Sequence, residues 1–326
     1  MTPERRAAVA LIALGACGVA LSQPAKTTYR VGFLVPRSST NFNDRLEAFR
    51  GGMTALGYVE GKNLTIEWRF ADGDYGRLPA LANELVASKV DVLVVDSTPG
   101  VKVARATTST IPIVMISVGD PVASGFVASL PRPGGNITGL SNVVADVSAK
   151  YVELLREAVP GLTRIAVLSN PDNATHAGIA TKVQAAGRTM GVRTSTIAAR
   201  NPEDIEAAFA TLRKDSAGAL IVLGDPFYGQ QARQLAALAL KDRVPTLTTN
   251  RALAEAGALM SYGQDLVEHY RRAATYVDAL LKGAKPSDLP VQQSRTIELV
   301  VNLKTAKALG LAIPPPLLLR ADDVIQ

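Results

Sequence analysis

The stretch IPIVMISVGDPVASGFVASLPRPGGNITGLSN, residues 111–142, decides how the rest of the chain is arranged. It begins with an apolar, β-branched run at residues 111–116, which predicts a buried strand. Asp120 precedes a proline, a pattern typical of a helix N-cap, so we expect a short helix to follow. Prolines and glycines at residues 131–135 end that helix. Residues 136–142 then read as an extended segment, which we interpret as a crossing between two lobes.

The remaining sequence alternates strands and helices in two halves that match each other. Three pairs of runs, about 130 residues apart, carry the match: YRVGFLVP with TRIAVLSNP, DVLVVDSTP with ALIVLGDP, and IPIVMIS with VPTLTTN. Strands that alternate with helices favour a parallel sheet covered on both faces. The sequence therefore predicts an α/β fold of two doubly wound parallel-sheet lobes.

The C-terminal part adds elements that a simple tandem does not need. A strand at 259–263, a long helix at 265–282 and an extended segment at 291–301 can return to the first lobe and then to the second. We therefore expect three hinge crossings. The expected division is a signal peptide and short linker at 1–28, a first lobe of 29–139 plus 265–290, and a second lobe of 140–264 plus 291–326.

Composition limits the classes of function. Of the 326 residues, 47% are hydrophobic and 20% charged, as in ordinary globular proteins. A net charge of +6 with 5% aromatic residues and no basic cluster argues against nucleic-acid binding. The single cysteine, Cys17, excludes an intramolecular disulfide and a cysteine-rich metal site.

The N-terminus is typical of an export signal. Arg5 and Arg6 precede an apolar run at residues 7–21, which is short for a membrane span. Two processing sites are open: a lipobox-like LGAC that ends at Cys17, and small residues before residue 22. We favour ordinary cleavage over lipidation because the apolar run continues past Cys17.

Ligands of open α/β sheets collect at the carboxyl ends of the strands. Here several of these ends carry a polar residue before a proline, a pattern that is typical of helix starts. The first N–H groups of a helix have no partner within the helix and can therefore bind a carboxylate. Each of these polar residues is also a common structural cap. The candidate ligand-binding residues are Ser39, Thr40, Ser97, Thr98, Asp120, Asn142, Asn170, Asp225, Tyr228, Asn250 and Tyr262.

Asp225 is the strongest candidate. Its carboxylate could bind a ligand ammonium while Phe227 and Tyr228 pack against the ligand side chain. The alternative is a capped turn with two wall residues. For Asp120 we favour a structural role, in which it fixes the loop before the hinge. For Asn142 and Tyr262 we slightly favour packing at the hinge over contact with the ligand.

Enzymatic motifs are missing from the sequence. The two histidines, His176 and His269, lie on separate helical patterns, and we expect His269 at the surface or between the lobes. No G-x-S-x-G, H-E-x-x-H or paired-cysteine motif occurs. We expect no catalytic residue, no metal and no cofactor.

Long runs resemble a known family. The runs GGMTALGYVEGKNLTIEWRFADG, residues 111–141 of the opening stretch, KYVELLREAVPGLTRIAVLSNP, LLKGAKPSDLPVQ and VVNLKTAKALGL resemble the ABC-transporter substrate-binding proteins that include tryptophan- and tyrosine-binding lipoproteins. The resemblance implies a type I periplasmic-binding-protein fold, with two lobes, three hinge strands and the ligand between them. It implies binding without catalysis.

These expectations together describe an extracytoplasmic receptor of an ABC importer. It would be a periplasmic monomer that captures a small polar ligand. The ligand would be an amino acid or a related carboxylate, and aromatic members of these classes are included. Its partner would be an ABC permease of the inner membrane, and a lipid on Cys17 would be its contact with the bilayer. The alternatives are a ligand-sensing ectodomain or accessory protein of a signalling system with the same fold, and, third, a secreted hydrolase.

Overall fold

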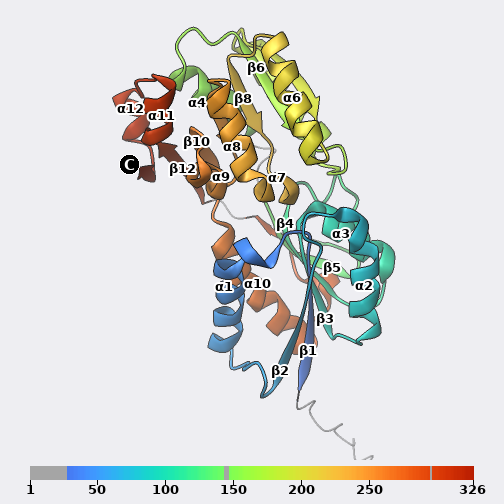
Figure 1. The fold of residues 1–326 in the computed structure, drawn as a ribbon. Coiled ribbons are helices and arrows are strands. Elements are labelled where there is room, and N and C mark those ends of the chain that lie inside the picture. The colour runs from blue at the N-terminus through green and yellow to red at the C-terminus, as the bar shows by residue number, and fades with distance from the viewer. Residues whose placement is uncertain (1–27, 143–146, 294–295) are drawn as a thin grey trace, which may run out of the picture.

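The computed structural model describes residues 28–142, 147–293 and 296–326, which form two α/β lobes stacked end to end (Figure 1). The sheet of the first lobe has the order β11-β5-β4-β3-β1-β2, and all of its neighbouring strands are parallel. Its strands are β1 (Tyr29–Val35), β2 (Leu64–Phe70), β3 (Val92–Asp96), β4 (Ile113–Val118), β5 (Ile137–Ser141) and β11 (Gln292–Gln293).

The sheet of the second lobe has the order β13-β12-β10-β9-β8-β6-β7. It is parallel except for the antiparallel pair of β10 and β12. Its strands are β6 (Arg164–Ser169), β7 (Arg193–Ala198), β8 (Ala219–Val222), β9 (Thr246–Thr248), β10 (Met260–Gln264), β12 (Ile297–Asn302) and β13 (Asp323–Ile325).

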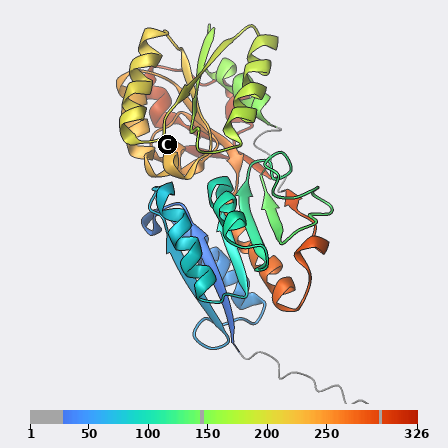
Figure 2. The same ribbon diagram turned by 90° about the vertical axis from the view of Figure 1, so that its right-hand side faces the viewer.

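Helices cover both faces of each sheet, as the alternating sequence predicts (Figure 2). In the first lobe, α1 (Asn43–Ala55) and α10 (Leu266–Leu281) pack on one face, and α2 (Leu78–Ala87) and α3 (Ser97–Thr107) on the other. In the second lobe one face carries α4 (Ser148–Ala158), α5 (His176–Thr189), α11 (Leu303–Leu309) and α12 (Pro315–Leu318). The other face carries α6 (Pro202–Lys214), α7 (Pro226–Gln230), α8 (Ala232–Lys241) and α9 (Arg251–Ala256).

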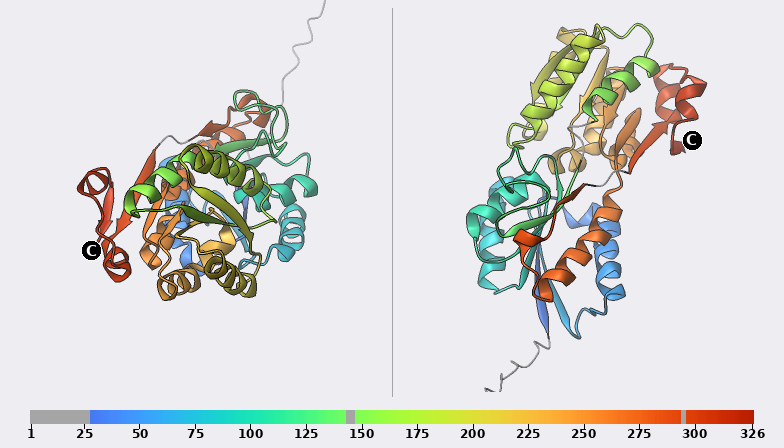
Figure 3. Two further views of the ribbon diagram at one scale, coloured as in Figure 1. Left: turned by 90° about the horizontal axis from the view of Figure 1, so that it is seen from above. Right: turned by 180° about the vertical axis from the view of Figure 1, so that it is seen from behind.

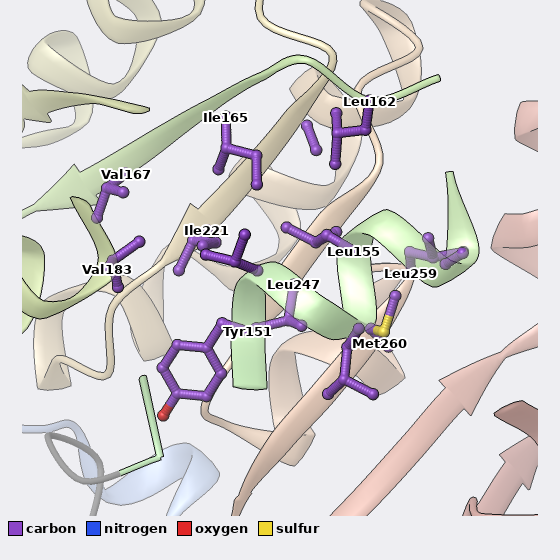
Figure 4. Close-up of a cluster of buried hydrophobic side chains, with 14 of the residues drawn as sticks. Tyr151, Leu155, Leu162, Ile165, Val167, Val183, Ile221, Leu247, Leu259 and Met260 are labelled. Atoms are coloured by element: carbon purple, nitrogen blue, oxygen red, sulfur yellow. The ribbon is translucent and has the colours of Figure 1, made fainter. Parts of the chain in front are cut away.

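Strand periodicity explains why each sheet has two cores. In β1, Phe33 packs into the core under α1 and α10, whereas its neighbour Leu34 packs into the core under α2 and α3. Successive side chains of a strand point to opposite faces, so a strand that is apolar throughout is buried on both sides. Figure 4 shows one of the two cores of the second lobe, to which α4 contributes Tyr151 and Leu155 and β8 contributes Ile221.

The chain passes between the lobes three times, and Figure 3 shows the C-terminal elements returning across the junction. The passages follow β5, β10 and β11. β5 continues to Ser141 and β11 reaches Gln293, both in the sheet of the first lobe. The strand bounds therefore place the passages two or three residues beyond the boundaries expected at 139 and 290.

The organising stretch differs from expectation in two ways. Residues 137–141 are a strand of the first sheet, and the crossing begins only after them. Gly139, with φ of +127°, is required there because a Cβ would lie 2.3 Å from the carbonyl oxygen of Met115. The helix expected after Asp120 is also wrong: residues 121–125 form turns. Gly125, with φ of +68°, ends the helical conformation after one turn.

No helix in the described ranges combines the length and the apolar character that crossing a bilayer requires. Cys17, Arg5 and Arg6 lie outside the described residues.

Candidate ligand-binding site

A small cavity of about 50 Å³ lies between the lobes, where the carboxyl ends of the strands of both sheets meet. It has room for only a few water molecules. Polar residues predominate in its lining, which is Arg37, Ser97, Thr98, Ser117, Gly119, Asn142, Asn173, Thr175, Ile179, Gly224, Asp225, Pro226, Thr249, Asn250, Gln264 and Leu266.

The first lobe contributes the start of α3, which follows β3 without a loop. The helix begins at Ser97, with Asp96 in the N-cap position, so Thr98 is not the cap that the sequence indicated. The Ser97 hydroxyl is buried and has no hydrogen-bond partner among the described residues. Thr98 Oγ1 accepts a 3.4 Å hydrogen bond from the Gly119 N–H. A helix N-terminus beside an unpaired hydroxyl suits a carboxylate.

Arg37 is the positive charge of this wall. Its Nε donates to Asp96 Oδ2 at 3.1 Å, and 11% of the Arg37 side chain is exposed. Burial lowers the pKa of Arg37, but the charge of Asp96 and those of nearby tyrosines outweigh it and raise the pKa above its ordinary value. Since Nε holds Asp96, the two terminal nitrogens remain available to the cavity.

The second lobe contributes Asp225, which is 3% exposed and does cap α7 as predicted. Its Oδ1 accepts hydrogen bonds from Tyr75 Oη at 2.7 Å, the Phe227 N–H at 3.0 Å and Asn170 Nδ2 at 3.1 Å. Its Oδ2 accepts one from Asn173 Nδ2 at 3.0 Å. A carboxylate has about four lone-pair sites, so Oδ2 is the oxygen with room for a further donor.

His176 fixes the loop behind Asp225. Its Nδ1 accepts from the Asn170 N–H at 2.9 Å, so the ring proton is on Nε2, which faces the Gly224 carbonyl at 3.1 Å. Burial lowers the pKa of His176 more than the nearby Asp225 raises it. The neutral ring is therefore a structural support and does not line the cavity.

Two predicted asparagines line the cavity, and a third lies behind it. Asn142 Nδ2 donates to the Ser117 carbonyl at 3.3 Å, and Asn250 caps α9. Asn170 does not start a helix, because α5 begins only at His176. It is 1% exposed and holds Asp225 from behind.

Four predicted residues lie away from the cavity. Tyr228 is 1% exposed, and its hydroxyl donates to the Ala199 carbonyl inside the second lobe. The Tyr262 ring packs edge-on against Tyr151, with 6.2 Å between ring centroids. Asp120 Oδ1 accepts from the Ala123 N–H and closes a turn, and Ser39 is exposed in a 3-10 turn.

A larger cavity of about 1330 Å³ adjoins the first and shares Arg37, Pro226, Asn250, Gln264 and Leu266 with it. Thr40 lines this outer cavity, together with residues of α1, α7, α9 and the start of α10.

The sequence missed several lining residues, namely Arg37, Ser117, Gly119, Asn173, Thr175, Thr249 and Gln264. Asn173 and Thr175 lie in the same loop as the predicted Asn170, so inspection of the whole loop would have found them. Arg37 follows the first strand directly and had the same signal as Ser39. No sequence pattern around Tyr75 indicated that it contacts Asp225 from the other lobe.

His269 is 0% exposed, so of the two expected positions, at the surface or between the lobes, the surface one is wrong. Within the described ranges its ring nitrogens have no hydrogen-bond partner, and no group of three His, Cys, Asp or Glu side chains could hold a metal ion.

Two lobes that enclose a polar cavity at their strand ends define a bilobal binding protein. The model of the family described as ABC transporter substrate binding protein matches residues 31–325, so the chain belongs to that family. The predicted type I periplasmic-binding-protein fold is confirmed, and the protein binds a substrate without transforming it.

Three similar proteins illustrate the relationship. A tyrosine-binding protein of Clostridioides difficile (strain R20291) is 26% identical over 268 residues, 81% of this chain and 77% of the relative. The ABC domain in complex with L-Trp from Streptococcus pneumonia is 25% identical, with a TM-score of 0.84 over 91% of this chain and 100% of that one. A conserved domain protein from Vibrio cholerae is 29% identical, with a TM-score of 0.86 over 91% and 99%.

Proposed function

We propose that this protein is the extracytoplasmic receptor of an ABC importer and captures an amino acid or a closely related small molecule between its lobes. The observation that carries the proposal is the pair of opposite charges in one cavity, Asp225 from the second lobe and Arg37 from the first. An α-amino acid carries the complementary pair of charges. The names of the relatives support the same class, since one binds tyrosine and another was solved with L-Trp.

The roles follow from the available atoms. Oδ2 of Asp225 receives the ligand ammonium, because Oδ1 already accepts three hydrogen bonds. The Arg37 terminal nitrogens, the Ser97 hydroxyl and the start of α3 receive the carboxylate. Asn142, Asn250, Thr98 and Thr40 line the path of the ligand. Binding from both lobes favours the closed arrangement, and the closed receptor delivers its ligand to a permease of the inner membrane.

Calorimetric titration of Asp225→Asn tests the ammonium role. The probes are L-tyrosine and 3-(4-hydroxyphenyl)propanoate, which differ in the ammonium alone. Loss of a charge-assisted hydrogen bond weakens binding by about ten- to a hundredfold, so the variant should lose affinity for tyrosine and little for the acid. Comparing two probes on one variant removes any general effect on folding.

Asp120→Asn is the matched control, because Asp120 also stands before a proline but lies outside the cavity. It should keep wild-type affinity for both probes. Equal loss of both probes in Asp225→Asn would refute a direct contact with the ammonium.

Export belongs to the same proposal and rests on the sequence of residues 1–28. Mass spectrometry of the protein from its host distinguishes cleavage near residue 22 from lipidation of Cys17. An intact N-terminus on exported protein would contradict both. We propose that the receptor acts as a monomer, which light scattering of the mature chain tests.

A further inference from the structure

Arg45, beside the ligand site, is a cation without an ion-pair partner in the part of the chain that the structure describes. It lies in the first turn of α1, lines the outer cavity and is half-buried. Its guanidinium carbon is 5.5 Å from the centroid of the Phe42 ring. Among the residues that the structure describes, it forms no ion pair and no side-chain hydrogen bond. Burial, and then the charge of Arg37, lower the pKa of Arg45 more than the charges of Tyr270, Asp96 and Asp44 raise it.

Two other arginines near this site are paired, whereas Arg233, which also lines the outer cavity, is exposed and forms no ion pair among the described residues. Arg50, on the same helix, also lies 5.5 Å over an aromatic ring, that of Trp68, but pairs with Glu47 at 3.0 Å and Glu60 at 3.1 Å. Across the outer cavity, Arg251 pairs with Glu255 at 2.8 Å. A half-buried cation loses part of its hydration, and without an anion beside it this loss is not offset by an ion pair. An anion that binds in the outer cavity near Arg45 would therefore be stabilised by an ion pair with it.

The acids that share the outer cavity do not supply that anion. Asp265 caps α10 by accepting from the Val267 and Glu268 N–H groups. Glu298 faces Arg251 at 3.9 Å. Asp44, the neighbour of Arg45 in sequence, is exposed and does not ion-pair with it in the described structure.

The cavities also offer little surface to an aromatic ligand. Among their described lining residues the one aromatic ring is Phe42, and Arg45 lies over it. Phe227 and Tyr228, which the sequence suggested as packing partners, are 5% and 1% exposed. A ligand whose head group fills the inner cavity must extend past Arg37 and Asn250, two of the five residues that the cavities share.

We infer that the ligand carries a second, distal anionic group, a carboxylate or phosphate, which lies in the outer cavity and pairs with Arg45. This inference rests on the proposed capture of an amino-acid head group and narrows the ligand class to acidic or phosphorylated members. The planar guanidinium can bind either anion through two parallel hydrogen bonds.

Calorimetric titration with matched probes tests the distal anion. L-Glutamate with L-glutamine and L-aspartate with L-asparagine test a carboxylate, and O-phospho-L-serine with L-serine tests a phosphate. Glutarate lacks the ammonium, and L-tyrosine lacks the distal anion. Wild-type protein should bind at least one anionic probe about ten- to a hundredfold more tightly than its neutral partner. Arg45→Gln should remove that preference, and Arg45→Lys should restore part of it.

Arg50→Gln is the control, because it removes a similar arginine of α1 that lies outside both cavities. It should leave every affinity unchanged. Unliganded melting curves of the variants show whether they fold. The inference is overturned if no anionic probe binds, if charged and neutral partners bind equally, or if Arg45→Gln keeps the preference. Tyrosine binding without acid binding would overturn it and leave the proposed function standing. Glutarate binding as tightly as glutamate, with loss in Arg45→Gln, would support it and refute the ammonium role of Asp225.

Discussion

The hydroxyl of Tyr75 donates a 2.7 Å hydrogen bond to Oδ1 of Asp225, and the two residues belong to different lobes. The same hydroxyl accepts a 3.3 Å hydrogen bond from the Phe227 N–H. Burial, and then the charge and hydrogen bond of Asp225, raise the pKa of Tyr75 well above its ordinary value. Tyr75 therefore stays protonated and joins the lobes through the carboxylate that we assign to the ligand. This contact stabilises the closed arrangement without needing a ligand.

Tyr75→Phe should open the unliganded protein. A hydrogen bond to a charged group contributes about 1.5–3 kcal/mol, so its loss should shift the closed-to-open ratio about ten- to a hundredfold. Small-angle scattering of the unliganded protein should show a larger radius of gyration. Tyr58→Phe removes a tyrosine–aspartate hydrogen bond of 3.0 Å, to Asp278, inside the first lobe, and should leave the radius unchanged. An equal radius in wild type and Tyr75→Phe would contradict a role in closure.

Gly119→Ala should hinder closure by steric contact. A Cβ on Gly119 would lie 2.9 Å from Oγ1 and 3.0 Å from Cβ of Thr175, which belongs to the other lobe. Ligand affinity should fall about tenfold or more while the unliganded melting temperature changes little, because each lobe keeps its own packing. Calorimetric titration with the best-binding probe measures the loss.

Two further variants identify the steric cause. Gly135→Ala is the control, since a Cβ there would have no neighbour within 4 Å. Adding Thr175→Gly to Gly119→Ala should recover affinity, because it removes the atoms that clash. Failure of this double variant to improve on Gly119→Ala would argue against the steric explanation.

Asp225→Asn should lower the stability of the unliganded protein. Capping alone predicts little change, because asparagine is also a good cap. The structure shows that both carboxylate oxygens accept hydrogen bonds, one of them from Asn173 Nδ2. An amide must turn an NH₂ group toward one of these donors, which costs about 1–3 kcal/mol. Urea unfolding measures the loss, and Asp120→Asn, in an exposed turn, should show much less.

His269 should make the protein sensitive to acid. Burial, and then the charge of Arg272, lower the pKa of His269 to about 4, below its ordinary value of 6.5. As the pH falls from 6.5 to 4, His269 therefore becomes protonated in the unfolded state but stays neutral in the folded state. The free energy of unfolding should drop by about 2–3 kcal/mol between pH 7 and pH 4.5 from this group.

His269→Leu should remove this part of the acid sensitivity. Other titrating groups, including His176, remain in both proteins, so the difference between their pH profiles isolates His269. Urea unfolding at both pH values measures it. Parallel profiles for wild type and variant would contradict the lowered pKa.

The position of Asn170 shows where local pattern stops being informative. Asn170-Pro171 and Asp225-Pro226 look equivalent in sequence, yet only Asp225 caps a helix at once. Asn170 instead donates its amide to Asp225, 55 residues away in the chain. A cap is a contact within one turn and can be predicted, whereas this hydrogen bond depends on how two loops of one sheet edge meet.

The sequence by itself determined the two lobes and their three passages, because apolar periodicity, β-branched runs and glycine or proline breaks act locally and repeat in both halves. It also placed Asp225, Ser97, Thr98, Asn142 and Asn250 at strand ends, and in the structure these residues line the cavity between the lobes. Only the tertiary structure decided that Arg37 is held by Asp96, that Tyr75 reaches Asp225 and that Arg45 forms no ion pair within the described ranges. Those relationships join residues far apart in the chain, and their geometry is set by the packing of each lobe and the docking of one lobe on the other.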